Sequence, residues 1–184
     1  MPISTLEFSH LAPQLVDIYI EAMGYSPSMR AQRIDIWRHD TTEPGWQCVI
    51  AHDGTHLLGV AYGHDGRANS WWTRQISRGL FEHGGPSQHQ REVLADFFEL
   101  TEIHVAPRYQ RQGIGMGLLQ ALLALTTRPY VLLSTPEVDL EANNAFGLYR
   151  AVGFSDFMRS FVFRGDPRPF AILEAALPLQ AGRH

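Results

Sequence analysis

The distribution of apolar and polar residues along the first third of the chain predicts a strand, two helices and a hairpin. Residues 3–8 alternate weakly, as in a strand, whereas apolar side chains recur at helical spacing over residues 11–23. A Ser-Pro pair at residues 26–27 is typical of the start of a second helix. Residues 46–52 and 57–63 are apolar runs around an Asp-Gly turn, which predicts a β-hairpin.

The rest of the chain alternates between helical and extended patterns. Helices are expected over residues 73–81, 88–94, 113–125 and 143–152, and strands over residues 97–105, 130–134, 154–163 and 170–177. This order predicts an α/β (α+β) fold, with a mixed sheet flanked by helices, in a single domain that spans residues 1–184.

Composition narrows the class of protein. The chain has 184 residues, of which 45% are hydrophobic, so one domain can bury a substantial core. No run reaches the roughly 18 apolar residues of a membrane span, and the first residues lack the order of a signal peptide, so we expect a cytoplasmic protein that binds no membrane. A net charge of −4 with scattered arginines argues against nucleic-acid binding. The one cysteine, Cys48, lies in an apolar run, which favours a buried structural thiol.

The segment Gln110-Arg111-Gln112-Gly113-Ile114-Gly115 carries the strongest chemical signal. It lies where the long apolar strand ends and an apolar helical pattern begins. Its glycines let the backbone approach a ligand closely, and the first N–H groups of a helix have no partner within the helix. Because such groups attract anions, the segment predicts a cradle for a pyrophosphate. A tight strand-to-helix turn without a ligand is the simpler alternative.

A second segment lies one strand further along the chain. Residues 143–154 combine a helical pattern with Leu148-Tyr149 and a Gly153-Phe154 exit. Together the two segments resemble the GNAT superfamily of acyl-CoA-dependent N-acetyltransferases, whose signature is Gln/Arg-x-x-Gly-x-Gly/Ala followed by a helix with Leu-Tyr-x-x-x-Gly-Phe. The resemblance is specific over residues 97–154. It implies a mostly antiparallel central sheet in which two central strands splay apart to take the pantetheine arm of acetyl-CoA.

The resemblance assigns cofactor contacts residue by residue. Ile103 and Val105 match positions whose backbone contacts the pantetheine. Arg111 stands where the family often has glycine, and it either reaches an adenosine phosphate or is solvated. The remaining positions that match the pyrophosphate loop are Gln110, Gln112, Gly113, Ile114, Gly115 and Met116.

The resemblance also implies catalytic roles. Tyr149 matches the general acid that protonates or hydrogen-bonds the departing CoA thiolate, although a tyrosine that only packs at a helix end is the alternative. Glu99 matches a strand glutamate that accepts the proton of the amine, through water. Glu102 and His104 alternate with Glu99 along the strand, should point to the opposite face, and compete as bases. The histidines and the cysteine lack metal-binding spacing, so we expect no metal.

Two features are particular to this chain. The family often has an asparagine seven residues before the tyrosine, but Ala142 occupies that position here. Asn143 or Asn144 therefore either takes over a role at the cofactor or caps the helix. The segment before the long strand offers aromatic residues for the wall of an acceptor pocket, namely Trp71, Trp72, Phe81 and His83. For Trp71 and Trp72, a place in the core or in a dimer contact is the alternative.

The expected function is acetyl transfer from acetyl-CoA to a primary amine by direct attack, with a small-molecule or peptide acceptor. A non-catalytic acyl-CoA-binding regulatory module and an acyltransferase that uses a longer acyl-CoA are the alternatives. The resemblance and the aromatic residues 157–170 also leave a homodimer open. The chain contains no lysine, so only its N-terminal amine could be acetylated in the protein itself.

Overall fold

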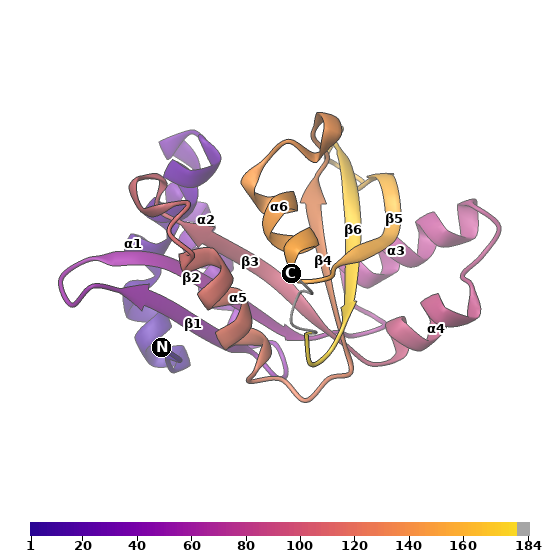
Figure 1. The fold of residues 1–184 in the computed structure, drawn as a ribbon, viewed down its shortest axis with the longest axis horizontal. Helices are drawn as coiled ribbons and strands as arrows, with labels where there is room; N and C mark the ends of the chain where they lie inside the picture. The colour runs from indigo at the N-terminus through magenta and orange to yellow at the C-terminus, as the bar shows by residue number, and fades with distance from the viewer. Residues whose placement is uncertain (180–184) are drawn as a thin grey trace. The chain divides into compact units, whose positions relative to one another are not determined.

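A computed structural model describes residues 1–179 and orders the strands β1-β2-β3-β4-β6-β5 (Figure 1). The strands are β1 (Gln47–His52), β2 (Leu57–Asp65), β3 (Phe97–Val105), β4 (Tyr130–Pro136), β5 (Ser155–Val162) and β6 (Pro169–Ala176). The α-helices are α1 (Thr5–Met23), α2 (Arg30–Asp40), α3 (Trp71–Glu82), α4 (Gln88–Ala95), α5 (Ile114–Leu123) and α6 (Asn144–Ala151). Single 3-10 turns lie at Pro27–Met29, Pro107–Tyr109 and Asp139–Glu141.

The sheet is mixed, as the sequence predicts. The pairs β1–β2, β4–β6 and β5–β6 are antiparallel, whereas β3 and β4 are parallel. The predicted α/β (α+β) class, with a mostly antiparallel sheet and flanking helices, is confirmed. The later helices and strands begin and end within a few residues of their predicted bounds.

One predicted element is wrong. Residues 3–8 do not form a strand. Helix α1 begins at Thr5 instead, and Pro2 makes an isolated bridge to Val49. The side chain of Ser4 accepts a hydrogen bond from Glu7 N (3.2 Å), and the Glu7 carboxylate accepts one from Ser4 N (2.8 Å). This capping box satisfies helix N–H groups and starts α1 earlier than the weak alternation suggested.

The chain forms two compact units. The first comprises Met1–His64 and Leu100–Thr126, and the second comprises Asp65–Glu99 and the described part of Thr127–His184. Strand β3 contributes its first three residues to the second unit and the rest to the first.

Aromatic packing builds the core of the first unit. Phe8 of α1 stacks on Trp37 of α2 (ring centroids 6.1 Å apart) and meets Tyr62 of β2 edge-on (5.3 Å). Helices α1 and α2 therefore cover one face of the β1–β2 hairpin. Helix α5 packs against β1, with Leu118 close to Gly59. Gly59 and Tyr62 are three residues apart on β2, so they face opposite sides of the hairpin. Helix α5, which lies close to Gly59, therefore covers the face opposite to α1 and α2.

The second unit has its own core. Its buried apolar side chains come from α3, α4 and the strands β3 to β6 and include Ile76, Leu80, Val93, Phe97, Leu132, Phe157, Phe161 and Ile172. In this unit β4 pairs with β3 from Phe97–Tyr130 to Glu99–Leu132, and it pairs with β6 along its whole length.

Candidate active site

The predicted pyrophosphate loop lies in the first unit, between the end of β3 and the start of α5. Gly113 precedes α5 with a left-handed backbone (φ 80°, ψ −2°), and no side chain caps the helix there within residues 1–179. The first helical bond runs from Gly117 N to Gly113 O (3.0 Å). The N–H groups of Ile114, Gly115 and Met116 precede it and have no partner within the helix. This helix start can accept an anion.

The glutamines and Arg111 shape the loop. The Gln110 side chain donates to Val105 O (3.0 Å), which ties the loop back to the end of β3. Arg111 adopts φ 60°, a left-handed conformation that favours glycine. Arg111 and Gln112 are exposed, so the guanidinium adds positive charge beside the helix start. Ile103 and Val105, two residues apart on β3, are half-buried.

The second unit contains the predicted catalytic residues Glu99 and Tyr149, and also Asn143. Glu99 is 7% exposed and pairs with Leu132 of β4, which pairs in turn with Glu174 of β6. Residues that pair across strands point to the same face, so two buried carboxylates flank Leu132. Glu174 lies 2.9 Å from His89 Nε2. The place of Glu174 could not be predicted from the sequence, because only strand register brings it into the row of Glu99.

Tyr149 is buried near the end of α6, with 6% of its surface exposed. Its ring packs against Phe154 (centroids 5.5 Å apart), and its carbonyl accepts a hydrogen bond from Phe154 N (3.0 Å). The Gly-Phe exit therefore folds back on the tyrosine. Asn143 caps α6, since its Oδ1 accepts a hydrogen bond from Phe146 N (2.8 Å).

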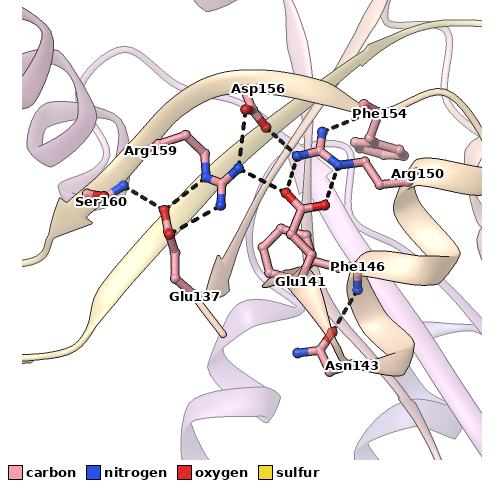
Figure 2. A network of polar contacts seen from close by, with 9 residues as sticks. All are labelled: Glu137, Glu141, Asn143, Phe146, Arg150, Phe154, Asp156, Arg159 and Ser160. Atoms are coloured by element: carbon pink, nitrogen blue, oxygen red, sulfur yellow. Dashed lines mark hydrogen bonds and ion pairs between the residues drawn. The ribbon is translucent and has the colours of Figure 1, made fainter. Parts of the chain in front are cut away.

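An arginine–carboxylate network, defined as Glu137, Glu141, Arg150, Asp156 and Arg159, connects α6 with the loop before it and with β5 (Figure 2). The loop before α6 also lines a surface hollow of about 580 Å³ together with Arg159 and Pro169. The sequence does not predict this network, because its members are spread over residues 137–159 and no motif links them.

The two competing bases contact each other in the first unit. His104 Nε2 lies 2.6 Å from Glu102 Oε2, and the two side chains are 10% and 17% exposed. The His104 ring stacks on Trp37 (6.3 Å) and meets Tyr19 edge-on (4.9 Å). Helices α1 and α2 thus enclose a carboxylate–imidazole pair, the arrangement that orients a histidine base.

The aromatic residues of α3 divide between surface and interior. Trp72 donates from Nε1 to Ser134 Oγ (3.2 Å), which ties α3 to β4. Trp71 is 52% exposed, although its ring stacks on Phe163 (5.6 Å), and Phe81 is 71% exposed. Among the four residues expected to wall an acceptor pocket, Trp71 and Phe81 are therefore the ones exposed to solvent. His83 bonds to Gly79 O through Nδ1 (2.8 Å).

Two further properties concern ions and membranes. Within residues 1–179 no group of three histidine, cysteine, aspartate or glutamate side chains is placed to hold a metal ion. No helix in that part of the chain is long and apolar enough to cross a membrane.

Comparison with known proteins identifies the class. A family model described as an acetyltransferase (GNAT) domain matches residues 44–156, which include residues of both units. The chain is 38% identical over 184 aligned residues to a GCN5-like protein acetyltransferase of Mycobacterium tuberculosis, covering 88% of this chain and 89% of the relative. The protein therefore belongs to the GNAT family of acetyltransferases.

One further relative and two solved structures are similar to this chain, and the structures share its fold. An Escherichia coli enzyme, named as an alanine N-acetyltransferase of a ribosomal protein, is 34% identical over 90 residues, covering 48% of this chain and 60% of the relative. Its crystal structure superposes with a TM-score of 0.61 at 19% identity, covering 98% of this chain and 96% of that one. The yncA structure of Salmonella typhimurium, solved with its cofactor acetyl-CoA, superposes with a TM-score of 0.60 at 13% identity, covering 94% and 92%.

Proposed function

We propose that the protein transfers the acetyl group of acetyl-CoA to a primary amine by direct attack. The glycine-capped start of α5 carries this proposal, because backbone N–H groups without a side-chain cap suit a pyrophosphate. We propose that residues 1–184 form one acyltransferase domain, since the match to the family model includes residues of both units. The cytoplasmic location expected from the sequence is retained.

In this proposal residues 110–116 hold the pyrophosphate, with Arg111 adding charge to a phosphate. Ile103 and Val105 bind the pantetheine through their backbone, and Asn143 contributes its amide to the cofactor while it caps α6. When bound, acetyl-CoA supplies the activated acyl group. The amine nitrogen bonds to the thioester carbon, the carbon–sulfur bond breaks, and the sulfur leaves with the electron pair.

Tyr149 is proposed to stabilise the leaving thiolate. A phenol has a pKa near 10 and a thiol near 8.5, so full proton transfer from an unperturbed tyrosine costs about 2 kcal/mol. A hydrogen bond that strengthens as charge develops on sulfur avoids that cost.

Glu99 is proposed to take the proton of the amine, through water. An alkyl amine with a pKa near 10.4 is mostly protonated at neutral pH, and reaching the free base costs on the order of 4–5 kcal/mol. A buried carboxylate is a better base than an exposed one, because burial disfavours its charged form. Glu99 is buried, which supports this choice. The Glu102–His104 pair is the competing base.

The acceptor is proposed to be a small-molecule or peptide amine. The relatives named above support a peptide, because one is named as a protein acetyltransferase and another as acting on the alanine of a ribosomal protein.

A two-stage experiment tests the proposal. Calorimetric titration with acetyl-CoA is expected to give saturable binding. Thiol release is then measured across a panel of peptide N-termini, polyamines, aminoglycosides and small amines. Amine-dependent release that falls in Tyr149→Phe supports acetyl transfer. Binding without release across the panel favours a regulatory module, whereas the absence of binding refutes the assignment of the loop.

A further inference from the structure

Helix α6 is too short to hold its own position. It has eight residues, and isolated helices of fewer than about 12–15 residues are marginal in water. Contacts with the rest of the second unit must therefore fix both of its ends. Asn143 fixes the first end by capping it (2.8 Å to Phe146 N). The other end carries Tyr149, and the next residue is Arg150.

Arg150 joins the end of α6 to the loop before the helix and to the chain at the start of β5 (Figure 2). Its Nε and Nη2 donate to the two oxygens of Glu141, at 2.9 and 2.5 Å, in the loop before the helix. Nη2 also donates to Asp156 of β5 (2.5 Å), and Nη1 donates to Phe154 O (3.1 Å). Phe154 is the residue on which the Tyr149 ring packs. The guanidinium therefore fixes both the helix end and the support of the tyrosine.

Arg159 on β5 completes the network (Figure 2). Its Nε and Nη2 donate to the two oxygens of Glu137, at 2.9 and 3.2 Å. Its Nη1 donates to Glu141 (2.9 Å) and Asp156 (3.2 Å). Glu141 and Asp156 are thus shared by the two arginines. The Phe146 ring of α6 lies beneath both guanidinium groups, at 5.9 Å from Arg150 and 5.6 Å from Arg159.

The network is more than a set of exposed ion pairs. Isolated surface pairs contribute little, but bidentate arginine–carboxylate pairs that share partners are geometrically specific. The backbone supports this reading, because Leu140 (φ 53°), Glu141 (φ 54°) and Ser160 (φ 53°) adopt left-handed conformations that such residues rarely take. The Arg150 guanidinium lowers the pKa of Glu141, and that of Arg159 lowers the pKa of Glu137, so both carboxylates stay ionised.

We propose that Arg150 is a positioning residue for Tyr149. With Glu141, Asp156 and Arg159, it holds α6 so that the Tyr149 hydroxyl is set for its role at the departing thiolate. This inference rests on the proposed function of Tyr149, and it assigns no direct contact between Arg150 and substrate.

The first test compares turnover in Arg150→Gln and Arg150→Lys with the matched control Arg168→Gln. Arg168 makes a similar arginine–carboxylate pair with Asp166 (2.6 Å), but the pair spans only one turn. Arg150→Gln is expected to lower kcat about tenfold or more while the KM for acetyl-CoA changes less than about threefold. Arg150→Lys should recover part of kcat, and Arg168→Gln should match the wild type.

A double-mutant cycle separates positioning from general destabilisation. If Arg150 acts through Tyr149, adding Arg150→Gln to Tyr149→Phe should lower kcat no further. The proposal would be overturned if the fold-decreases in kcat of the two single variants multiplied in full in the double variant. It would also be overturned if folded Arg150→Gln had the kcat of the wild type. If Arg150→Gln does not fold, Arg159→Gln is measured in the same cycle, with a smaller loss of kcat expected.

Hydrogen exchange on the free protein provides a readout that needs no enzymatic activity. Amides of α6 should lose protection in Arg150→Gln and keep it in Arg168→Gln. Unchanged protection in Arg150→Gln would overturn the proposal. Wild-type kcat in Tyr149→Phe would instead refute the proposed role of the tyrosine, and the exchange data would then decide alone whether Arg150 fixes α6.

Discussion

Two glycines in helices of the second unit should respond in opposite directions to the same substitution. Alanine is favoured over glycine in a helix interior by about 1 kcal/mol. At Gly147 of α6, an added Cβ would meet nothing within 4 Å, so Gly147→Ala should realise this gain. At Gly79 of α3, it would lie 2.6 Å from the Phe161 ring and 3.2 Å from the Met158 sulfur.

The crowding at Gly79 decides the sign there. Phe161 is 5% exposed and packs edge-on against Phe163 (4.8 Å), so its ring has little room to move. Overpacking a core costs about 1–3 kcal/mol, which exceeds or offsets the helical gain of about 1 kcal/mol. We expect Gly147→Ala to melt about 2–4 °C above the wild type and Gly79→Ala to melt below it.

Thermal and urea unfolding of the two variants test this reasoning. Phe161→Leu, which removes ring atoms next to the new methyl group, should reduce the loss caused by Gly79→Ala when the two are combined. If Gly79→Ala stabilises the protein as much as Gly147→Ala does, the close packing of α3 against β5 is refuted.

Three further outcomes are expected. Burial raises the pKa of Asp40, which accepts a hydrogen bond from Tyr62. Because the pKa of Asp40 is higher in the folded than in the unfolded protein, ionisation of Asp40 lowers the stability of the wild type as the pH rises. In urea titrations, Asp40→Asn should therefore gain stability relative to the wild type between about pH 4 and about pH 7. A difference in unfolding free energy that does not change with pH would contradict this. Burial also raises the pKa of the Cys48 thiol, so thiol reagents should label the protein only as it unfolds, whereas rapid stoichiometric labelling in buffer would contradict the buried position. Gly113→Ala places an alanine in a left-handed conformation (φ 80°), which costs about 1–2 kcal/mol. The melting temperature should therefore fall by roughly 2–8 °C, and an unchanged melting curve would refute the left-handed loop geometry.

The sequence predicts those parts of the fold that depend on local chemistry. The hairpin and the glycine start of α5 follow from residues next to one another, and the structure confirms both. The start of α1 was also available from the sequence, since Ser4 and Glu7 have capping-box spacing. This capping box is a more specific signal than the weak alternation over residues 3–8, and it decides the structure of that segment.

The parts that could not be predicted depend on register and on contacts between distant segments. Glu174 joins Glu99 in one row only because both strands flank β4. Arg159 meets Glu137 across 22 residues, on backbone conformations that the sequence does not indicate. The pairing of Glu102 with His104 is local, but its enclosure by Trp37 and Tyr19 depends on how α1 and α2 pack.

The most direct test of the central claim is the mass of the acceptor after incubation with the protein and acetyl-CoA. The account predicts that a peptide or small amine gains the mass of one acetyl group, in a product that resists hydroxylamine as an amide does. The side chains of the protein itself give little background, because the chain contains no lysine. An acceptor of unchanged mass across the amine panel, in the presence of bound acetyl-CoA, would contradict the claim that the protein is an N-acetyltransferase acting on primary amines.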